Sequence, residues 1–304
     1  MQPDCEVNAK KEYKLGMICA FFSAILWGFL PLYWKALIPI HSSLIILYRI
    51  VMAAVTAFVA AWKYYGFSGI KMPLTQKGLV WKLFASGCLI MANWSIYIFA
   101  VNAGHVIQTC IGYYIEPLMV CVFGIVFFKE RPTKLKTVSL LFALLGVLIV
   151  LVHFKQVPVI ALSLAITFAT YTAIKKHLRL EALIALVYET IFLAPIALVL
   201  ILYFEINGKG ALAVGQPYQF GLLLLSGILT ATPLGLFAMA ANRISLISLG
   251  IVEYIAPSIT LLIGIFLFKE AFDLIQFIAF VVIWIGLVFF TYDEVKYSRK
   301  EVKK

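Results

Sequence analysis

The sequence predicts an all-α polytopic membrane protein with ten transmembrane helices in two inverted five-helix repeats, and with both termini in the cytoplasm. Three observations lead to this fold class. The composition is strongly apolar, ten apolar stretches have the length of a membrane span, and a sequence motif recurs 140 positions after its first appearance.

The composition excludes a soluble globular domain. Hydrophobic residues make up 63% of the 304 residues, charged residues only 13%, and the mean hydropathy is +1.02. A membrane β-barrel is also excluded, because its strands alternate apolar and polar residues over about 10 positions. The apolar runs of this chain are continuous and about twice as long.

A helix needs about 20 mostly apolar residues to cross a bilayer. Ten stretches meet this requirement: 17–37, 43–62, 81–101, 105–128, 135–153, 158–174, 182–204, 218–240, 246–268 and 273–291. The first is too long for a signal peptide and lacks a cleavage site, so it is counted as a true helix. The chain then divides into a cytoplasmic N-terminal segment (1–16), a first repeat (17–153), a second, inverted repeat (154–291) and a basic cytoplasmic tail (292–304).

Positive residues indicate the orientation, because short cytoplasmic loops are enriched in Lys and Arg. With the N-terminus inside, 20 of the 25 Lys and Arg residues fall on the cytoplasmic side and 4 on the other. The net charge of +11 is thus interpreted as a topology signal and an attraction to anionic lipid. Nucleic-acid binding is not expected.

The recurring motif reads "YIEPLMVCVFGIVFFKE" at 114–130 and "YIAPSITLLIGIFLFKE" at 254–270. The same offset of 140 relates Ser86 and Gly87 to Ser226 and Gly227. Chance likeness of apolar helices is the alternative, but polar positions match as well. Duplication of a five-helix unit places the second copy upside down, an arrangement typical of secondary transporters with a midplane substrate site.

Charged residues inside a membrane span cost about 2.5–3.5 kcal/mol each on insertion scales, and four stand out away from the ends of the predicted spans. They are Arg49, Glu116, Glu189 and Glu253. Arg49 and Glu189 are 140 positions apart, which predicts an inter-repeat ion pair. This pair would act either as a structural clamp between the halves or in gating and substrate binding.

Prolines mark predicted helix breaks at Pro117, Pro233 and Pro257, because proline removes a helical hydrogen bond. Broken backbone at membrane depth is tolerated beside protein or a water-filled cavity. Glu116 and Glu253 lie close to two of these prolines, so we expect them to carry protons or attract a cationic group. The alternative is that both glutamates only pack.

Aromatic rings with polar tips, together with amides, suit a pocket for a small amphipathic molecule. Nine such residues lie in or near the spans, and all but Tyr114 are candidate substrate-binding residues: Trp27, Asn93, Trp94, Tyr97, Asn102, Tyr113, Tyr114, Tyr171 and Tyr254.

Motifs for enzymatic chemistry are absent from the sequence. It has no phosphate-binding G-x-x-x-x-G-K-[ST] loop, no H-E-x-x-H and no G-x-S-x-G, so neither ATP hydrolysis nor another enzymatic activity is expected. The five cysteines show no C-x-x-C spacing, which argues against a metal site or a disulfide framework. We expect no cofactor.

Several segments resemble the RarD-type proteins, linked to chloramphenicol sensitivity, of the EamA group in the drug/metabolite transporter superfamily. They include "NWSIYIFAVNAGHVIQTCIGYYIEPL", "YETIFLAP" and "GILTATPLGLFAMAANRISLISLGIVEYIAP". The resemblance implies ten helices in two inverted halves, a central cavity, and export or exchange of small metabolites such as amino acids, or of drugs. The family more often has Asn or Ser at Glu116 and Gln at Glu253, and "HR" at Tyr48 and Arg49. These departures favour a cationic solute or proton coupling.

The sequence therefore predicts a secondary transporter of the bacterial inner membrane, monomeric or homodimeric, that moves small organic solutes by alternating access. A passive facilitator or channel of the same fold is one alternative. A non-transport membrane protein, such as a lipid-handling enzyme or a scaffold, is another.

Overall fold

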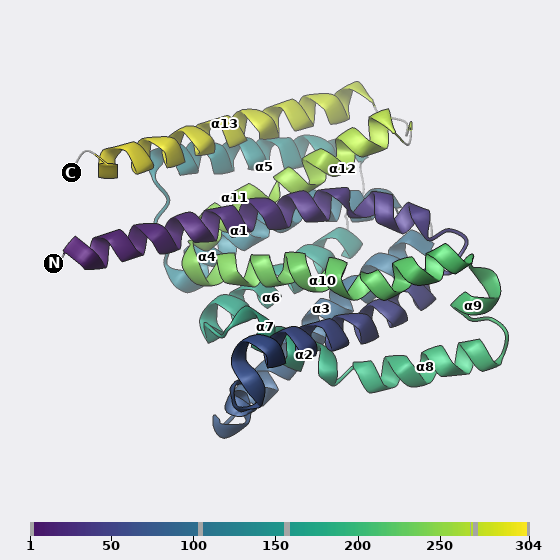
Figure 1. Cartoon of the computed structure of the whole chain (residues 1–304). Helices are drawn as coiled ribbons and strands as arrows, with labels where there is room; N and C mark the ends of the chain where they lie inside the picture. The colour runs from purple at the N-terminus through teal and green to yellow at the C-terminus, as the bar shows by residue number, and fades with distance from the viewer. Residues whose placement is uncertain (1–2, 103–105, 155–158, 268, 270–272, 303–304) are drawn as a thin grey trace.

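The computed structural model describes residues 3–102, 106–154, 159–267, 269 and 273–302, and in this part of the chain all regular structure is helical (Figure 1). The helices are α1 (Pro3–Ala36), α2 (Ser42–Thr75), α3 (Leu79–Asn102), α4 (Val106–Phe128), α5 (Lys134–Phe154), α6 (Val159–Leu178), α7 (Ala182–Ile191), α8 (Ala194–Ile206), α9 (Ala211–Val214), α10 (Pro217–Arg243), α11 (Leu246–Glu253), α12 (Ile255–Phe266) and α13 (Leu274–Val302).

The helices fit a polytopic membrane protein. Within the described residues, 8 helical segments are long and apolar enough to cross a membrane, and the bent pair α7 and α8 would make a ninth. A shorter apolar helix, Gly112–Phe128, lies where the fourth span is predicted. The count of ten spans therefore stays a prediction.

Two predicted segments differ from their expected form. The span 182–204 is divided into α7 and α8, which meet at an angle of 50°. Pro195 stands in the first turn of α8, where its ring opposes a continuous helix by clashing with the carbonyl four residues earlier. The second helix runs beyond position 62 to Thr75, with a kink at Gly66, whose φ of 66° favours glycine.

The predicted helix breaks are corrected at two of three prolines. Helices α4 and α10 continue through Pro117 and Pro233. One missing hydrogen bond does not end these helices, which neighbouring helices hold on several sides. An interruption does occur at Tyr254, between α11 and α12 and three residues before Pro257.

The helices pack as closely associated pairs. Helix α5 packs on α13, α4 on α6 and α11, α1 on α10 and α12, and α2 on α7 and α10. Glycines allow two of the closest approaches: a Cβ atom at Gly87 would lie 2.5 Å from the Glu189 carbonyl oxygen, and one at Gly227 would lie 2.2 Å from that of Met52. Small residues at such crossings are typical of membrane helix packing.

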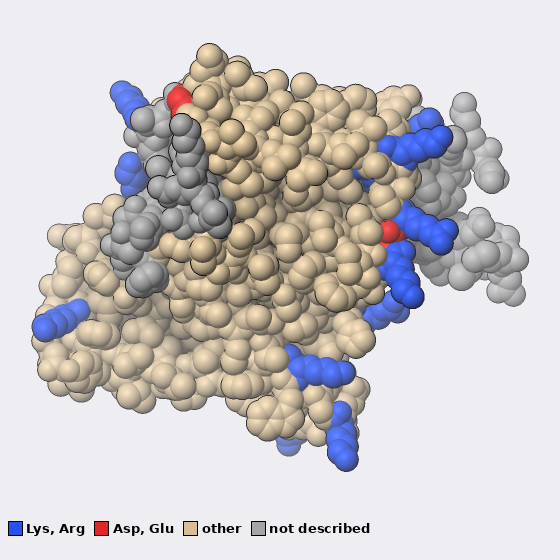
Figure 2. Space-filling view, turned by 180° about the vertical axis from the view of Figure 1, so that it is seen from behind, with Lys and Arg blue, Asp and Glu red and all other residues tan. Residues whose placement is uncertain are grey.

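Both termini lie at one end of the bundle, which we call the terminal end, whereas the α1–α2 connection lies at the opposite, far end (Figure 1). Most of the Lys and Arg side chains visible in Figure 2 gather at the terminal end. The surface between the two ends is almost free of charge in this view, as expected for a surface that faces lipid.

Candidate functional site

A cavity of about 520 Å³ lies among α1, α2, α3, α4 and α12. Its wall includes Ile38 of the α1–α2 connection and Gln276 in the first turn of α13, which place one limit of the cavity at the far end. Trp27, in the C-terminal half of α1, and Leu234, near the middle of α10, line its deeper part. The lining is mostly apolar and aromatic, with a few polar groups, as is usual for small-molecule sites.

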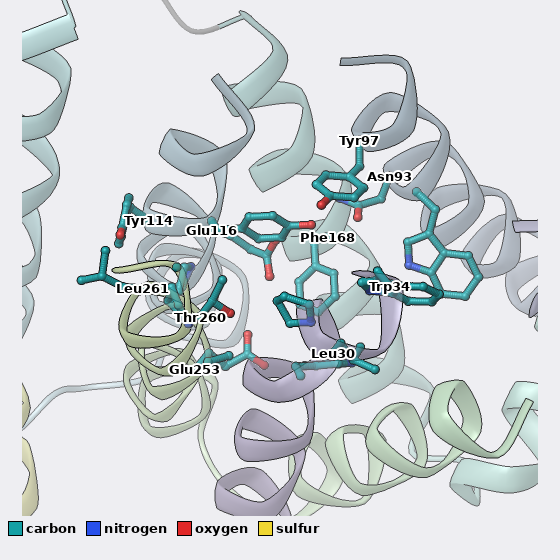
Figure 3. Close-up of a pocket in the computed structure, with 18 of the residues that line it drawn as sticks. Leu30, Trp34, Asn93, Tyr97, Tyr114, Glu116, Phe168, Glu253, Thr260 and Leu261 are labelled. Atoms are coloured by element: carbon teal, nitrogen blue, oxygen red, sulfur yellow. The ribbon is translucent and has the colours of Figure 1, made fainter. Parts of the chain in front are cut away.

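Glu116 on α4 and Glu253 on α11 are both in the cavity wall. Figure 3 shows their carboxyl groups pointing into the same space, and the two helices that carry them pack against each other. Glu253 is the last residue of α11, directly before the helix interruption, and is only 5% exposed. Its Oε2 has no hydrogen-bond partner among the described residues.

Arg49 on α2 also lines the cavity, and it does not pair with Glu189. Its Nε donates to Thr230 Oγ1 at 2.8 Å. The guanidinium carbon lies 3.9 Å from the ring centroid of Trp94 and 5.2 Å from that of Trp34, which are cation–π contacts. The predicted inter-repeat ion pair is therefore wrong, because Arg49 turns toward aromatic rings of the cavity.

Glu189 instead belongs to a buried network at the junction of α3, α6 and α7. Lys175 Nζ lies 2.8 Å from its carboxylate, and Ser86 Oγ donates to Oε1 at 2.8 Å. Tyr171 donates to Oε2 at 3.3 Å. The sequence interpretation missed Lys175 because it was counted as a loop residue. The sequence did contain a signal for this partner, because Glu189 is an acidic residue within a span and lies only 14 positions after Lys175.

Five of the eight candidate substrate-binding residues line the cavity: Trp27, Asn93, Trp94, Tyr97 and Tyr113. The Asn93 amide nitrogen donates to the Leu164 carbonyl at 2.8 Å and to Thr167 Oγ1 at 3.0 Å, so this side chain is held by α6.

The other three candidates are not part of the cavity wall as described. Tyr171 is fully buried in the Glu189 network. Tyr254 is 1% exposed, and its hydroxyl donates to the Tyr114 carbonyl at 3.1 Å. The side chain of Asn102 lies outside the described residues. Burial and internal hydrogen bonds thus assign the two tyrosines a structural role.

Other cavity residues were not predicted. Trp34 and Leu30 follow Trp27 on one face of α1, and Phe168, Thr260 and Gln276 come from three further helices. The spacing of Trp27, Leu30 and Trp34, at i, i+3 and i+7, was a signal for a shared helical face. No local pattern brings the other three residues to the same place.

The terminal side of the cavity is closed by close packing of α4 against α11. A Cβ atom at Gly250 would lie 2.5 Å from the Pro117 carbonyl oxygen and 2.7 Å from Cys121 Sγ. The small size of Gly250 therefore lets the backbones of α4 and α11 meet on the terminal side of Glu116.

Beyond this contact, Glu130 joins three helices at the terminal end. Its carboxylate accepts the backbone N–H groups of Leu246 at 2.8 Å and of Ile247 at 3.0 Å, at the first turn of α11. Lys176, in the last turn of α6, lies 3.2 Å from the same carboxylate and donates to the Ile244 carbonyl at 2.6 Å. We call these four residues, Glu130, Lys176, Leu246 and Ile247, the Glu130 clasp.

Within the described residues, no group of three or more His, Cys, Asp or Glu side chains is arranged to hold a metal ion. The polar groups of the cavity are thus one guanidinium, two carboxyl groups, amides and hydroxyls. Such a set can hold an organic solute by charge and hydrogen bonding, and a carboxyl group can also carry a proton.

Comparison with known proteins gives consistent matches over nearly the whole chain. The EamA-like transporter family matches twice, at residues 14–152 and 157–292. The "Uncharacterized transporter YojE" of Bacillus subtilis (strain 168) is 39% identical over 294 residues, which cover 95% of this chain and 97% of that protein. "Protein RarD" of Escherichia coli (strain K12) is 30% identical over 300 residues, covering 96% and 99%.

A solved crystal structure shares the fold with a TM-score of 0.70, covering 90% of this chain and 96% of its own at 14% identity. The family and relatives confirm the resemblance predicted from the sequence. The apolar helices and the bacterial relatives together indicate an integral protein of the bacterial inner membrane.

Proposed function

The chain belongs to the EamA-like transporter family, and from this premise we propose that it moves small organic solutes through the central cavity by alternating access. The solutes are amino acids or drug-like amphipathic molecules. One observation carries the proposal: the cavity extends toward the far end, whereas on its terminal side α4 packs closely against α11 and the Glu130 clasp lies beyond this contact. A binding site closed on one side is what one state of an alternating-access transporter requires.

Two inverted repeats supply the mechanical element in this proposal. The double match to the family supports two copies of one unit. The packing supports it too. If each of the first five spans is exchanged for its counterpart among the last five, α4 corresponds to α12 and α6 to α1, and the α4–α6 contact becomes the α12–α1 contact, which is also present. The same exchange converts α1–α10 into α6–α3. Rocking of one copy against the other would then close the far end and open the terminal end.

We place the terminal end in the cytoplasm, since most positive residues lie there in sequence and in Figure 2. The structure then corresponds to an outward-facing state. In this state, Glu116 and Glu253 face the outside through the cavity. Protonation or cation binding at these two carboxyl groups is the proposed coupling between solute movement and a gradient.

Uptake into proteoliposomes tests the transport proposal. The purified full-length protein is given a mixed pool of amino acids, amines and chloramphenicol, with and without an imposed pH gradient. We expect accumulation of at least one solute against its gradient in the wild type, and only equilibration in the Glu116→Gln/Glu253→Gln variant. Glu12→Gln is the matched control, because Glu12 is an exposed partner of Arg243 at the terminal end. Equilibration without accumulation by the wild type would make the protein a facilitator.

The clasp can be tested separately from transport. A single cysteine at Thr260, in the cavity wall, is labelled from either side of the membrane in a cysteine-free background. Glu130→Gln removes the negative charge that interacts with two backbone N–H groups and with Lys176. Because charge-assisted hydrogen bonds are about twice as strong as neutral ones, this substitution should weaken the clasp. We expect labelling from the terminal side to rise several-fold. Unchanged labelling in Glu130→Gln and in Glu130→Ala would contradict the assigned role of the clasp.

A further inference from the structure

The cavity keeps its positive and negative groups apart. Arg49 projects from α2, whereas Glu116 and Glu253 project from α4 and α11. Among the described side chains, no carboxylate pairs with Arg49, and no Lys or Arg pairs with either glutamate. Charged groups at membrane depth normally pair with one another or with backbone, because isolated charges are costly there. This separation needs an explanation.

Arg49 is held in a fixed orientation with donors to spare. Its Nε is used by Thr230, and the rings of Trp94 and Trp34 lie against the guanidinium group. A guanidinium carries five N–H donors in a planar fork, which matches a carboxylate or another oxyanion with two parallel hydrogen bonds. Bonding to Thr230 occupies one of these donors. The rest of the fork suits an anion brought in by the solute.

The two glutamates offer the complementary subsite. Glu253 is 5% exposed, lines the cavity, and has an oxygen without a partner among the described residues. Figure 3 shows Glu116 directed into the same space. Two carboxyl groups with free acceptor capacity in an apolar wall suit the ammonium group of a solute, which offers three donors.

Rings and aliphatic side chains line the space around the charged groups. Trp27, Trp34 and Phe168 contribute large apolar faces. A volume of about 520 Å³ lies within the range of small-molecule sites, roughly 300–1,000 Å³. The body of the solute is therefore expected to be apolar or aromatic.

Resting on the transport function proposed above, we propose that Arg49 is the anion subsite of the cavity and that Glu116 and Glu253 form its cation subsite. The cavity then selects zwitterionic solutes that carry an oxyanion, an ammonium group and an apolar body. Such a solute brings a counter-charge to both sides of the wall at once. A purely cationic solute would leave Arg49 without a counter-charge.

Binding to the purified full-length protein in detergent tests this assignment without requiring transport. The probes are phenylalanine, its amide, which is only cationic, and 3-phenylpropionate, which is only anionic; the dipeptide glycyl-phenylalanine adds a zwitterion with a wider charge separation. Quenching of tryptophan fluorescence reports binding, because Trp34 and Trp94 lie in the wall. We expect at least one zwitterion to bind about tenfold or more tightly than both singly charged probes.

Variants of Arg49 then locate the anion subsite. Arg49→Gln is expected to weaken zwitterion binding by roughly tenfold to a hundredfold, as for a lost hydrogen bond between charged groups, and to leave the amide unchanged. Arg49→Lys keeps the charge but not the fork, so it should retain an intermediate affinity. Arg243→Gln, at the terminal end, is the matched control, and elution as a single peak on gel filtration checks folding.

Two results would overturn the assignment. The first is that the wild type binds the zwitterions no more tightly than the amide, or binds neither detectably. The second is that folded Arg49→Gln protein binds the zwitterions as tightly as the wild type does. Neither depends on accumulation in proteoliposomes. If the wild type accumulates amines without regard to a carboxylate, transport stands and the anion subsite fails. If charge-selective binding occurs without any uptake, the anion subsite stands and transport fails.

Discussion

Replacing Lys175 by methionine tests which partner holds Glu189 in the folded protein. The Lys175 and Glu189 side chains are 4% and 0% exposed, and their charged atoms lie 2.8 Å apart. Removal of one partner from a buried ion pair costs about 3–5 kcal/mol, because the other charge stays buried without compensation. Ser86 and Tyr171 still donate to Glu189, so we expect a loss near the lower limit, about 3 kcal/mol.

Thermal unfolding in detergent, followed by gel filtration after heating, measures this loss. At about 2 °C per kcal/mol for a chain of this size, Lys175→Met should lower Tm by roughly 6 °C. The double variant Lys175→Met/Glu189→Gln removes both charges and should recover most of the loss, since apolar replacements of buried pairs are often nearly neutral. The coupling of the two substitutions in a double-mutant cycle is the quantity to compare.

A parallel cycle of Arg49→Gln with Glu189→Gln gives the decisive contrast. Because Arg49 contacts Thr230 and two tryptophan rings instead, these substitutions should be additive within about 0.5 kcal/mol. Strong coupling of Arg49 to Glu189, with additivity between Lys175 and Glu189, would refute the reasoning.

Two further predictions concern packing and a helix cap. Gly227→Ala should destabilise the protein by about 1–3 kcal/mol in the same unfolding assay, because the new Cβ would lie 2.2 Å from the Met52 carbonyl oxygen; Gly221→Ala on the same helix, with open space around it, should be neutral. Equal effects of the two substitutions would contradict this explanation. The backbone N–H of Gln276 lowers the pKa of Asp273, so this carboxylate stabilises the fold above about pH 3.9 and loses its effect as the pH falls. Asp273→Asn should therefore lower Tm at pH 7, and the difference should shrink as the pH falls below about 3.9; a difference independent of pH would refute the charge-based explanation.

Hydropathy alone located most of the fold. The predicted apolar stretches overlap helices throughout the described part of the chain, because the length of an apolar run is a local property, but only 8 or 9 candidate spans are found there. The bend between α7 and α8 and the continuity of α10 through Pro233 were not predicted. A proline weakens a helix wherever it occurs, but the surrounding packing decides whether the helix bends there, and this packing is not a local property.

The candidate site was predicted in part for a similar reason. Glu116, Glu253 and Arg49 were identified because charge in an apolar run is visible in the sequence, and all three line the cavity. The partner of Glu189 was not identified. An offset of 140 shows which positions correspond in the two repeats, but it does not show in which direction their side chains point. Lys175 reaches Glu189 from the neighbouring helix α6, which was predicted to end one residue earlier, at position 174.

The two copies supply similar walls and different chemistry. Glu116 corresponds by the repeat to Ala256, and Glu253 corresponds to Tyr113, yet all four residues line the cavity. Position 49 and its equivalent, Glu189, have diverged further, since one is in the cavity and the other in a buried network. A symmetric site would present each group twice and would suit a symmetric solute. Because the position equivalent to each charged cavity residue places no charge in the cavity, the wall is polar in a fixed direction, and in the proposed transport cycle a bound solute would keep a defined orientation.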